Sequence, residues 1–195
     1  MLLFTSLSAP NPRRVHLYLA RKGLRIPTRE VDLGAGEHFS EEFRALNPDC
    51  VVPALRLDDG SVVTESVAIC RAIEALHPDP PMFGTDPASI GQVAMWIRRT
   101  EIQAYLPTQD AYRNSRRGFA GRALPGTQGD VPQIPELVAR SASTIRRFLG
   151  RVDAHLAGRE HLVGQDFTMA DVVLQGTLEF GVRTRFEPVT DLSPW

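Results

Sequence analysis

The amino-acid sequence predicts an α/β domain followed by an all-helical domain. In the first 77 residues, short alternating and β-branched runs are interleaved with amphipathic helical patterns. The segment "HPDPPMFGTDP" then carries four prolines and no periodicity, which is typical of a linker. Long amphipathic helical patterns follow it. We therefore expect an α/β domain over residues 1–77, a linker over 78–85 and an all-α domain over 86–195.

The elements of the first domain follow one another in the order β-α-β-α-β-β-α. "MLLFT" predicts a buried strand, and the helix after it has Asn11 as its expected N-cap and Gly23 as its stop. Asp58-Asp59-Gly60, between two β-branched runs, predicts a hairpin turn. The remaining elements are a strand in "IPTREVDL", a short helix in "SEEFRALN" and a helix over residues 65–77. This order predicts a mixed sheet covered by helices.

The second domain shows helical patterns in three places. "ASIGQVAMWIRRTEIQAYL" and "IPELVARSASTIRRFLGRVDAHLAG" predict long amphipathic helices, with a Gly/Pro-rich segment between them. "DFTMADVV" predicts a further helix start, with Thr168 as N-cap and Asp171, three residues later, as its capping-box partner. We interpret Thr168 and Asp171 as a folding device.

Composition excludes several classes of function. The 195 residues are 43% apolar and carry a net charge of −1, so no overall field recruits nucleic acid or a membrane surface. The arginine-rich "YRNSRRGFAGR" lacks interleaved stacking aromatics, so we interpret it as a solvated loop. No apolar run reaches the length of about 18 residues that a membrane span needs, and we expect a cytoplasmic protein.

Cys50 and Cys70 have no metal-ligand spacing; we expect Cys70 to be buried and Cys50 to lie in an exposed loop.

Pro53 stands at the mouth of the predicted hairpin, where an ordinary strand would not place a proline. A proline cannot donate to a strand ladder, so it belongs at an edge, a strand start or a kink. Thr64-Glu65-Ser66 begins the next helix at the other end of the same hairpin. The local pattern leaves open whether pairing or another partner uses this end of the hairpin.

Three motifs carry a family resemblance: "NPDCVVPAL", "DDGSVVTESVAICRAIE" and "FTMADVV", in this order. With them, the chain resembles the cytosolic glutathione transferases, and in "SAPNPRRV", "GEHFSEEF" and "MWIRRTEI" it looks like their bacterial, theta- or nu-like members. The resemblance implies a thioredoxin-like N-terminal domain, an all-α C-terminal domain and a homodimer. It also implies detoxification chemistry in which glutathione is the cosubstrate, a small hydrophobic electrophile is its partner, and no metal takes part.

For glutathione binding, the resemblance implies a cis bond between Val52 and Pro53, with the backbone of Val52 turned toward the cysteinyl backbone of glutathione. Ser66, at a helix start, would bind the γ-glutamyl carboxylate, because free amides and the helix dipole favour an anion there. Glu65 would take the ammonium group. His38 would bind the glycine carboxylate, whereas Val51 stands where many relatives carry a polar or basic residue for that carboxylate.

The residue that stabilises the glutathione thiolate is less defined. Relatives place a hydroxyl, phenol or thiol side chain just before the helix-opening turn, and in this chain that position is Ala9. Ser8 beside it and Asn11 after it are the two candidates, and a chain without effective activation is the third possibility. Ser6 lies further from the helix.

For the electrophile, the resemblance indicates Trp96, Arg99, Tyr105 and Tyr112 of the second domain. In relatives, a segment like "DLSPW" leads into a further helix that often roofs this site. We therefore expect a shallow, open electrophile site, or a native protein that is longer. A glutathione-dependent disulfide oxidoreductase and a non-catalytic binding or regulatory protein stay open as alternatives, the latter because of Ala9 and Val51.

Overall fold

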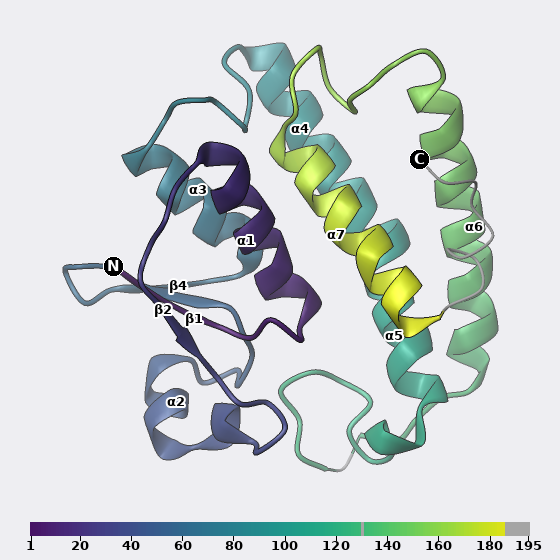
Figure 1. Cartoon of the computed structure of the whole chain (residues 1–195). Helices are drawn as coiled ribbons and strands as arrows, with labels where there is room; N and C mark the ends of the chain where they lie inside the picture. Colours follow the sequence, from purple (N-terminus) through teal and green to yellow (C-terminus); the bar gives the residue numbers. More distant parts are fainter. Residues whose placement is uncertain (130, 186–195) are drawn as a thin grey trace. The chain divides into compact units, whose positions relative to one another are not determined.

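The computed structural model of the chain describes residues 1–129 and 131–185, and its elements are labelled in Figure 1. The chain divides into two compact units, Met1–Met82 and the residues from Phe83 onward. The division falls inside the Pro-rich segment 78–85 of the sequence. Each unit is described by itself below.

The first unit contains a four-stranded sheet in the order β2-β1-β3-β4. Its strands are β1 (Leu2–Thr5), β2 (Thr28–Glu30), β3 (Ala54–Arg56) and β4 (Val62–Thr64). Strand β2 runs parallel to β1, whereas β3 is antiparallel to both β1 and β4. The mixed sheet expected from the sequence is confirmed, including the hairpin of β3 and β4.

The helices of the first unit lie on both sides of this sheet (Figure 1). They are α1 (Pro10–Lys22), α2 (Glu41–Leu46) and α3 (Ser66–Leu76), with a 3₁₀ turn at Glu37–Phe39. Helix α1 packs against α3 on one face. On the other face, Phe43 of α2 joins Phe4, Val31, Val52 and Ala54 in a buried cluster.

The start of α1 differs from the sequence-based expectation. Its N-cap is Ala9, so the helix begins at Pro10 and Asn11 lies inside the first turn rather than at the cap. Proline is well suited to a first helical position, because its φ is already helical and its missing N–H would have no partner there. The expected stop at Gly23 is confirmed, with φ at 65°.

The second unit is helical. It contains α4 (Pro87–Thr100), a π-helical turn (Glu101–Tyr105), α5 (Leu106–Ser115), α6 (Glu136–Leu156) and α7 (Met169–Thr184), with a 3₁₀ turn at Arg117–Phe119. The helix expected over residues 88–106 continues through the π-helical turn into α5. Only Leu106 separates this turn from Pro107, which has no N–H for the α-helical ladder.

Helix α7 is the most buried helix of this unit. Nearly all its residues as far as Gly181 have low exposure, and it packs against α4 and α5, while α6 packs against α5. Within residues 1–129 and 131–185, no helix is long and apolar enough to cross a membrane. No group of His, Cys, Asp and Glu side chains in the same residues is arranged to hold a metal ion.

Candidate functional site

One end of the sheet brings together chain segments that are far apart in the sequence. In the sheet register, Ala54 is opposite both Phe4 and Thr64. The residues that follow β1, precede β3 and follow β4 therefore leave the ladder at the same end. Strand β2 is parallel to β1, so the segment that leads from it to the 3₁₀ turn begins there as well. Every glutathione-site residue expected from the sequence lies on one of these segments.

Val52 lies at this end of the sheet, directly before Pro53 and β3. The Val52-Pro53 peptide bond is cis, as the sequence resemblance implied. Among the described residues, no hydrogen bond reaches the amide or carbonyl of Val52, whereas the neighbouring carbonyl of Val51 accepts one from Asn47 Nδ2 at 2.8 Å. Val52 packs its side chain into the cluster with Phe4 and Phe43. A residue whose backbone N–H and C=O are both unused can pair with the extended backbone of a ligand.

Glu65 and Ser66 lie where β4 gives way to α3. Glu65 is the N-cap with φ at 66°, a backbone region that non-glycine residues rarely adopt and that is often found at functional sites. Its side chain is exposed and its carboxylate has no recorded partner in the described part of the chain. Ser66 begins the helix and is only 3% exposed. This end of α3 presents amide donors, a hydroxyl and a carboxylate together.

The two candidates for thiolate stabilisation lie where β1 leads into α1, with Ser8 in the connecting turn and Asn11 in the first turn of the helix. Ser8 is exposed, and its hydroxyl lies 3.1 Å from the hydroxyl of Ser6. Asn11 Oδ1 is buried and has no hydrogen-bond partner in the described part of the chain. The same does not hold for its Nδ2, which is either exposed or hydrogen-bonded. Glu30 stabilises the turn by accepting a hydrogen bond from the amide of Leu7 at 3.0 Å. Both side chains therefore lie within three residues of the start of α1, and the structure does not choose between them.

His38 lies on the 3₁₀ turn Glu37–Phe39, where its ring packs on Phe39 with centroids 3.9 Å apart. The carboxylate of Glu37 holds this turn. It accepts hydrogen bonds from Arg29 at 3.0 Å and from the amide of Asp32 at 2.8 Å. The imidazole is half-buried at a position fixed to the end of β2.

The two cysteines are both buried. The expected burial of Cys70 is confirmed, and this burial raises the pKa of its thiol. The expected exposure of Cys50 was wrong, because it is 5% exposed and its Sγ lies 3.5 Å from the carbonyl of Pro48. The loop after α2 turns inward there, so its position before Pro53 did not imply access to solvent.

In the second unit, the four residues expected near an electrophile form two groups: Trp96 with Arg99, and Tyr105 with Tyr112, whose rings both contact Phe180. Trp96 is buried against His155 of α6, with ring centroids 4.5 Å apart, and Arg99 lies over the indole. Tyr105 is buried and donates a hydrogen bond to Gln109 at 3.1 Å. Tyr112 lines a cavity.

This cavity has a volume of about 220 Å³ and is lined by Tyr112, Ser115, Arg116, Thr184 and Arg185. Of these five residues, the sequence indicated only Tyr112; Ser115, Arg116, Thr184 and Arg185 were missed. No local pattern marks them, because α5 and α7 meet only through the folding of the unit. The expected open electrophile site concerns the segment "DLSPW", which lies outside the described residues.

Sequence comparison defines the class of protein. Residues 9–76 match the family model of the glutathione S-transferase N-terminal domain, and residues 102–194 match that of the C-terminal domain. The chain belongs to the glutathione S-transferase family. The fold expected from the sequence, a thioredoxin-like domain with an all-helical domain, is thereby confirmed.

Particular relatives span most of the chain. Glutathione S-transferase 2 of Saccharomyces cerevisiae is 28% identical over 96% of this chain and 78% of the relative. Glutathione S-transferase 3 of Zea mays is 33% identical over 84% of this chain and 70% of the relative. A probable elongation factor 1-gamma of Arabidopsis thaliana is 29% identical over 73% of this chain, which spans only 31% of that protein.

Solved structures show the same fold. A glutathione S-transferase domain-containing protein of Marinobacter aquaeolei VT8 superposes with a TM-score of 0.85 at 28% identity, covering 95% of this chain and 88% of the other. Gtt2 of Saccharomyces cerevisiae also superposes with a TM-score of 0.85, at 27% identity, covering 96% of this chain and 88% of the other. Ure2p in complex with glutathione superposes with a TM-score of 0.75, at 25% identity, covering 94% of this chain and 85% of the other.

Proposed function

We propose that this protein is a glutathione transferase that joins the glutathione thiolate to small electrophiles. The observation that carries the proposal is one end of the sheet, where Val52 precedes β3 and Glu65 and Ser66 follow β4; the backbone of Val52 has no hydrogen-bond partner among the described residues. The protein offers three kinds of group there: the backbone of Val52, the hydroxyl and amide of Ser66, and the carboxylate of Glu65. Glutathione has a counterpart for each, namely an extended amide backbone, an α-carboxylate and an ammonium group. The complex of Ure2p with glutathione supports the same ligand.

The cysteinyl part of glutathione would pair with Val52. An extended peptide that pairs with the backbone N–H and C=O of Val52 forms two hydrogen bonds, and these do not depend on its side chains. Each such bond stabilises a complex by about 0.5–1.5 kcal/mol net. This contact positions the cysteinyl sulfur next to the turn between β1 and α1.

The γ-glutamyl part would bind at the start of α3. Its carboxylate takes the hydroxyl and amide of Ser66, where the helix dipole adds a favourable term of about 0.3–1 kcal/mol. The exposed carboxylate of Glu65 takes the ammonium group. His38 takes the glycine carboxylate from the opposite side, and the apolar Val51 adds nothing to that contact.

For the thiolate, Ser8 and Asn11 stay the two candidates. The free thiol has a pKa of about 8.5, so lowering it by one unit requires about 1.4 kcal/mol of preferential stabilisation. One hydroxyl or amide donor and the nearby start of α1 are of this size. Asn11 is supported by its place in the first turn of α1, and Ser8 by its exposed position on the turn before that helix.

The remaining assignments follow from the family. Trp96, Arg99, Tyr105 and Tyr112 are proposed to lie on the electrophile side, and we propose a cytoplasmic homodimer that needs no metal. Ile90, Met95, Ile102 and Leu106 leave apolar surface exposed along α4 and its continuation, which a second copy would cover.

A non-catalytic binding protein is the second candidate function. The relatives named elongation factor 1-gamma support it, because they carry this domain within a much longer chain. A disulfide oxidoreductase has less support, since Cys50 is buried.

Three measurements on the same preparation separate these functions. Calorimetry should give glutathione binding, an aryl halide should be conjugated, and a mixed disulfide should be reduced slowly or not at all. Binding without either turnover would identify the non-catalytic protein. Disulfide reduction faster than conjugation would identify the oxidoreductase, and absence of glutathione binding would refute all three.

A further inference from the structure

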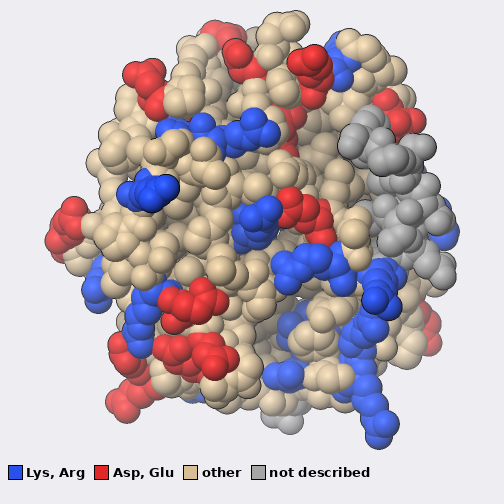
Figure 2. Space-filling view, viewed as in Figure 1, with Lys and Arg blue, Asp and Glu red and all other residues tan. Residues whose placement is uncertain are grey.

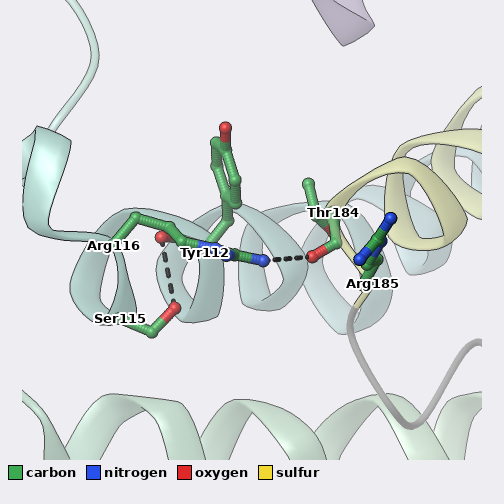
Figure 3. Close-up of a pocket in the computed structure, with 5 residues that line it drawn as sticks. All are labelled: Tyr112, Ser115, Arg116, Thr184 and Arg185. Atoms are coloured by element: carbon green, nitrogen blue, oxygen red, sulfur yellow. Dashed lines mark hydrogen bonds between the residues drawn. The ribbon is translucent and has the colours of Figure 1, made fainter.

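We propose that the cavity between the ends of α5 and α7 binds a small aryl carboxylate. This inference rests on contacts within the second unit; it shares Tyr112 with the proposed electrophile side and uses no contact with glutathione. Figure 3 shows the five residues that line the cavity, and none of them is acidic. Two guanidinium groups, from Arg116 and Arg185, stand among hydroxyl groups and one aromatic ring.

Arg116 is held in place but keeps donors for a ligand. One of its terminal nitrogens donates to the carbonyl of Thr184 at 2.8 Å, which joins the end of α5 to the end of α7. Its guanidinium carbon lies 5.8 Å from the centroid of the Tyr112 ring. A guanidinium carries five N–H donors, so most of those of Arg116 are not used by this bond.

Arg185 has no recorded partner for its side chain within residues 1–129 and 131–185. Its backbone is the C-cap of α7, with φ at 54°. In Figure 3, it stands beside Thr184, while Tyr112 lies on the other side of the Arg116–Thr184 hydrogen bond. Because the charge of Arg185 has no partner among the described residues, its guanidinium is available to an anion there.

The charge of the cavity selects a monoanion. Helices α5 and α7 both end here, and each C-terminus presents a partial negative charge of about half a unit. The two ends together offset about one of the two arginine charges. A carboxylate neutralises the remainder, and a guanidinium can bind it through two parallel hydrogen bonds.

The surroundings of the cavity are basic rather than acidic. Arg117 and Arg122 follow on the exposed loop after α5. Figure 2 shows Lys and Arg side chains gathered on the lower right of the molecular face, over the region where Figure 1 draws the end of α5. Such a field attracts anions toward the cavity.

Tyr112 and the size of the cavity define the rest of the ligand. The Tyr112 ring is held edge-on by Phe119 and Phe180, at centroid distances of 5.2 Å and 5.8 Å, so it offers a fixed aromatic surface. A volume of about 220 Å³ equals the share of about seven waters at ~30 Å³ each. This is below the range of about 300–1,000 Å³ for drug-sized ligands, and it suits a single ring with a carboxylate.

Benzoate tests the proposal, with benzamide as the uncharged analogue of the same shape and acetate as the carboxylate without a ring. Titrated into the full chain by calorimetry at low salt, benzoate should bind at least about tenfold more tightly than either control, which corresponds to about 1.4 kcal/mol. Equal binding of benzamide would overturn the anion site. Equal binding of acetate would overturn the aryl assignment.

Variants locate the binding. Arg185→Gln and Arg116→Gln should each weaken benzoate binding about tenfold, and Arg117→Gln, the same change of charge on an exposed neighbour outside the lining, should alter it less than twofold. An equal loss in all three would show diffuse surface charge and refute the site. Melting curves of the three variants identify any loss that comes from unfolding.

Glutathione separates this proposal from the proposed function. Saturating glutathione should leave benzoate binding within threefold, and Arg185→Gln should leave glutathione binding unchanged. Full displacement of benzoate by glutathione would show that benzoate occupies the glutathione site, and would refute the cavity. A parent protein that binds benzoate but no glutathione would refute only the proposed function.

Discussion

Thr168 donates two hydrogen bonds to Asp171, one from its backbone amide and one from its hydroxyl, and both reach Oδ2 at 2.8 Å. The other oxygen, Oδ1, accepts a third from the amide of Leu162 at 2.8 Å. One buried carboxylate therefore fixes both the start of α7 and the loop before it.

Asp171→Ala should lower the melting temperature by about 5–10 °C, because it leaves buried amide donors without acceptors at a total cost of about 2–3 kcal/mol. Thermal unfolding followed by circular dichroism measures the change. Asp153→Ala, at an exposed position of α6, is the matched control and should shift the midpoint by less than about 2 °C. A parent-like melting curve for Asp171→Ala would contradict the capping role, and glutathione affinity should stay the same in both variants.

Glu65→Ala should weaken glutathione binding by about 1–3 kcal/mol, the usual cost of removing a charge-assisted hydrogen bond, and should leave the fold intact. Titration calorimetry measures this as a rise in Kd of between about fivefold and 150-fold. Glu41→Ala, an exposed acidic residue in the first turn of α2, should have no effect. Unchanged affinity in a folded Glu65→Ala protein would show that the ammonium group binds elsewhere.

Glu65→Gly should be more stable than Glu65→Ala by about 1 kcal/mol. The φ of 66° brings a Cβ into unfavourable contact with the backbone, whereas glycine has no Cβ. Both variants lack the carboxylate, so their difference in urea unfolding isolates the backbone. If the alanine variant were the more stable, position 65 would carry no strain.

Bound glutathione should have a thiol pKa below its free value of about 8.5 if a donor on the β1–α1 turn stabilises the thiolate. Thiolate absorbance measured against pH reports this value in the parent protein. Removing the responsible donor, by Ser8→Ala or by Asn11→Ala, should raise the pKa toward the free value, and the other variant should change it little. An unshifted pKa in the parent would support a protein that binds glutathione without activating it.

Glu74→Leu should destabilise the first unit by about 3–5 kcal/mol, because it leaves a buried ammonium without its counter-charge. The side chain of Lys22 is fully buried and donates to Glu74 at 2.8 Å and to the carbonyl of Pro80 at 2.7 Å. Lys22→Met should cost less, since Glu74 keeps the hydrogen bond from the amide of Met82 at 2.7 Å.

The double variant Lys22→Met/Glu74→Leu is the control for this pair. It should be more stable than Glu74→Leu alone, because it removes the unpaired charge. Urea unfolding of the parent, the two single variants and the double variant gives the four free energies of unfolding that the double-mutant cycle needs. Strictly additive losses would show that the two residues do not stabilise each other.

The candidate glutathione site was largely predictable from the sequence, because it consists of local motifs. Pro53 stands directly before a β3 start, and Glu65 and Ser66 stand directly after β4, so a few neighbouring residues define each one. The position of Asn11 was harder to predict. Two prolines compete for the first turn of α1, and the sequence alone placed the helix start two residues too late.

By itself, the sequence determined the order of strands and helices, the division into an α/β unit and a helical unit, the capping pair of α7 and the family. These features depend on residues within about ten positions of each other, where backbone preference and hydrophobic periodicity act directly. Tertiary structure alone decided that Cys50 is buried and that Arg116 meets Thr184, 68 residues further along the chain. Burial and cavities depend on which distant side chains fill the same space, and no local pattern records the outcome of that packing.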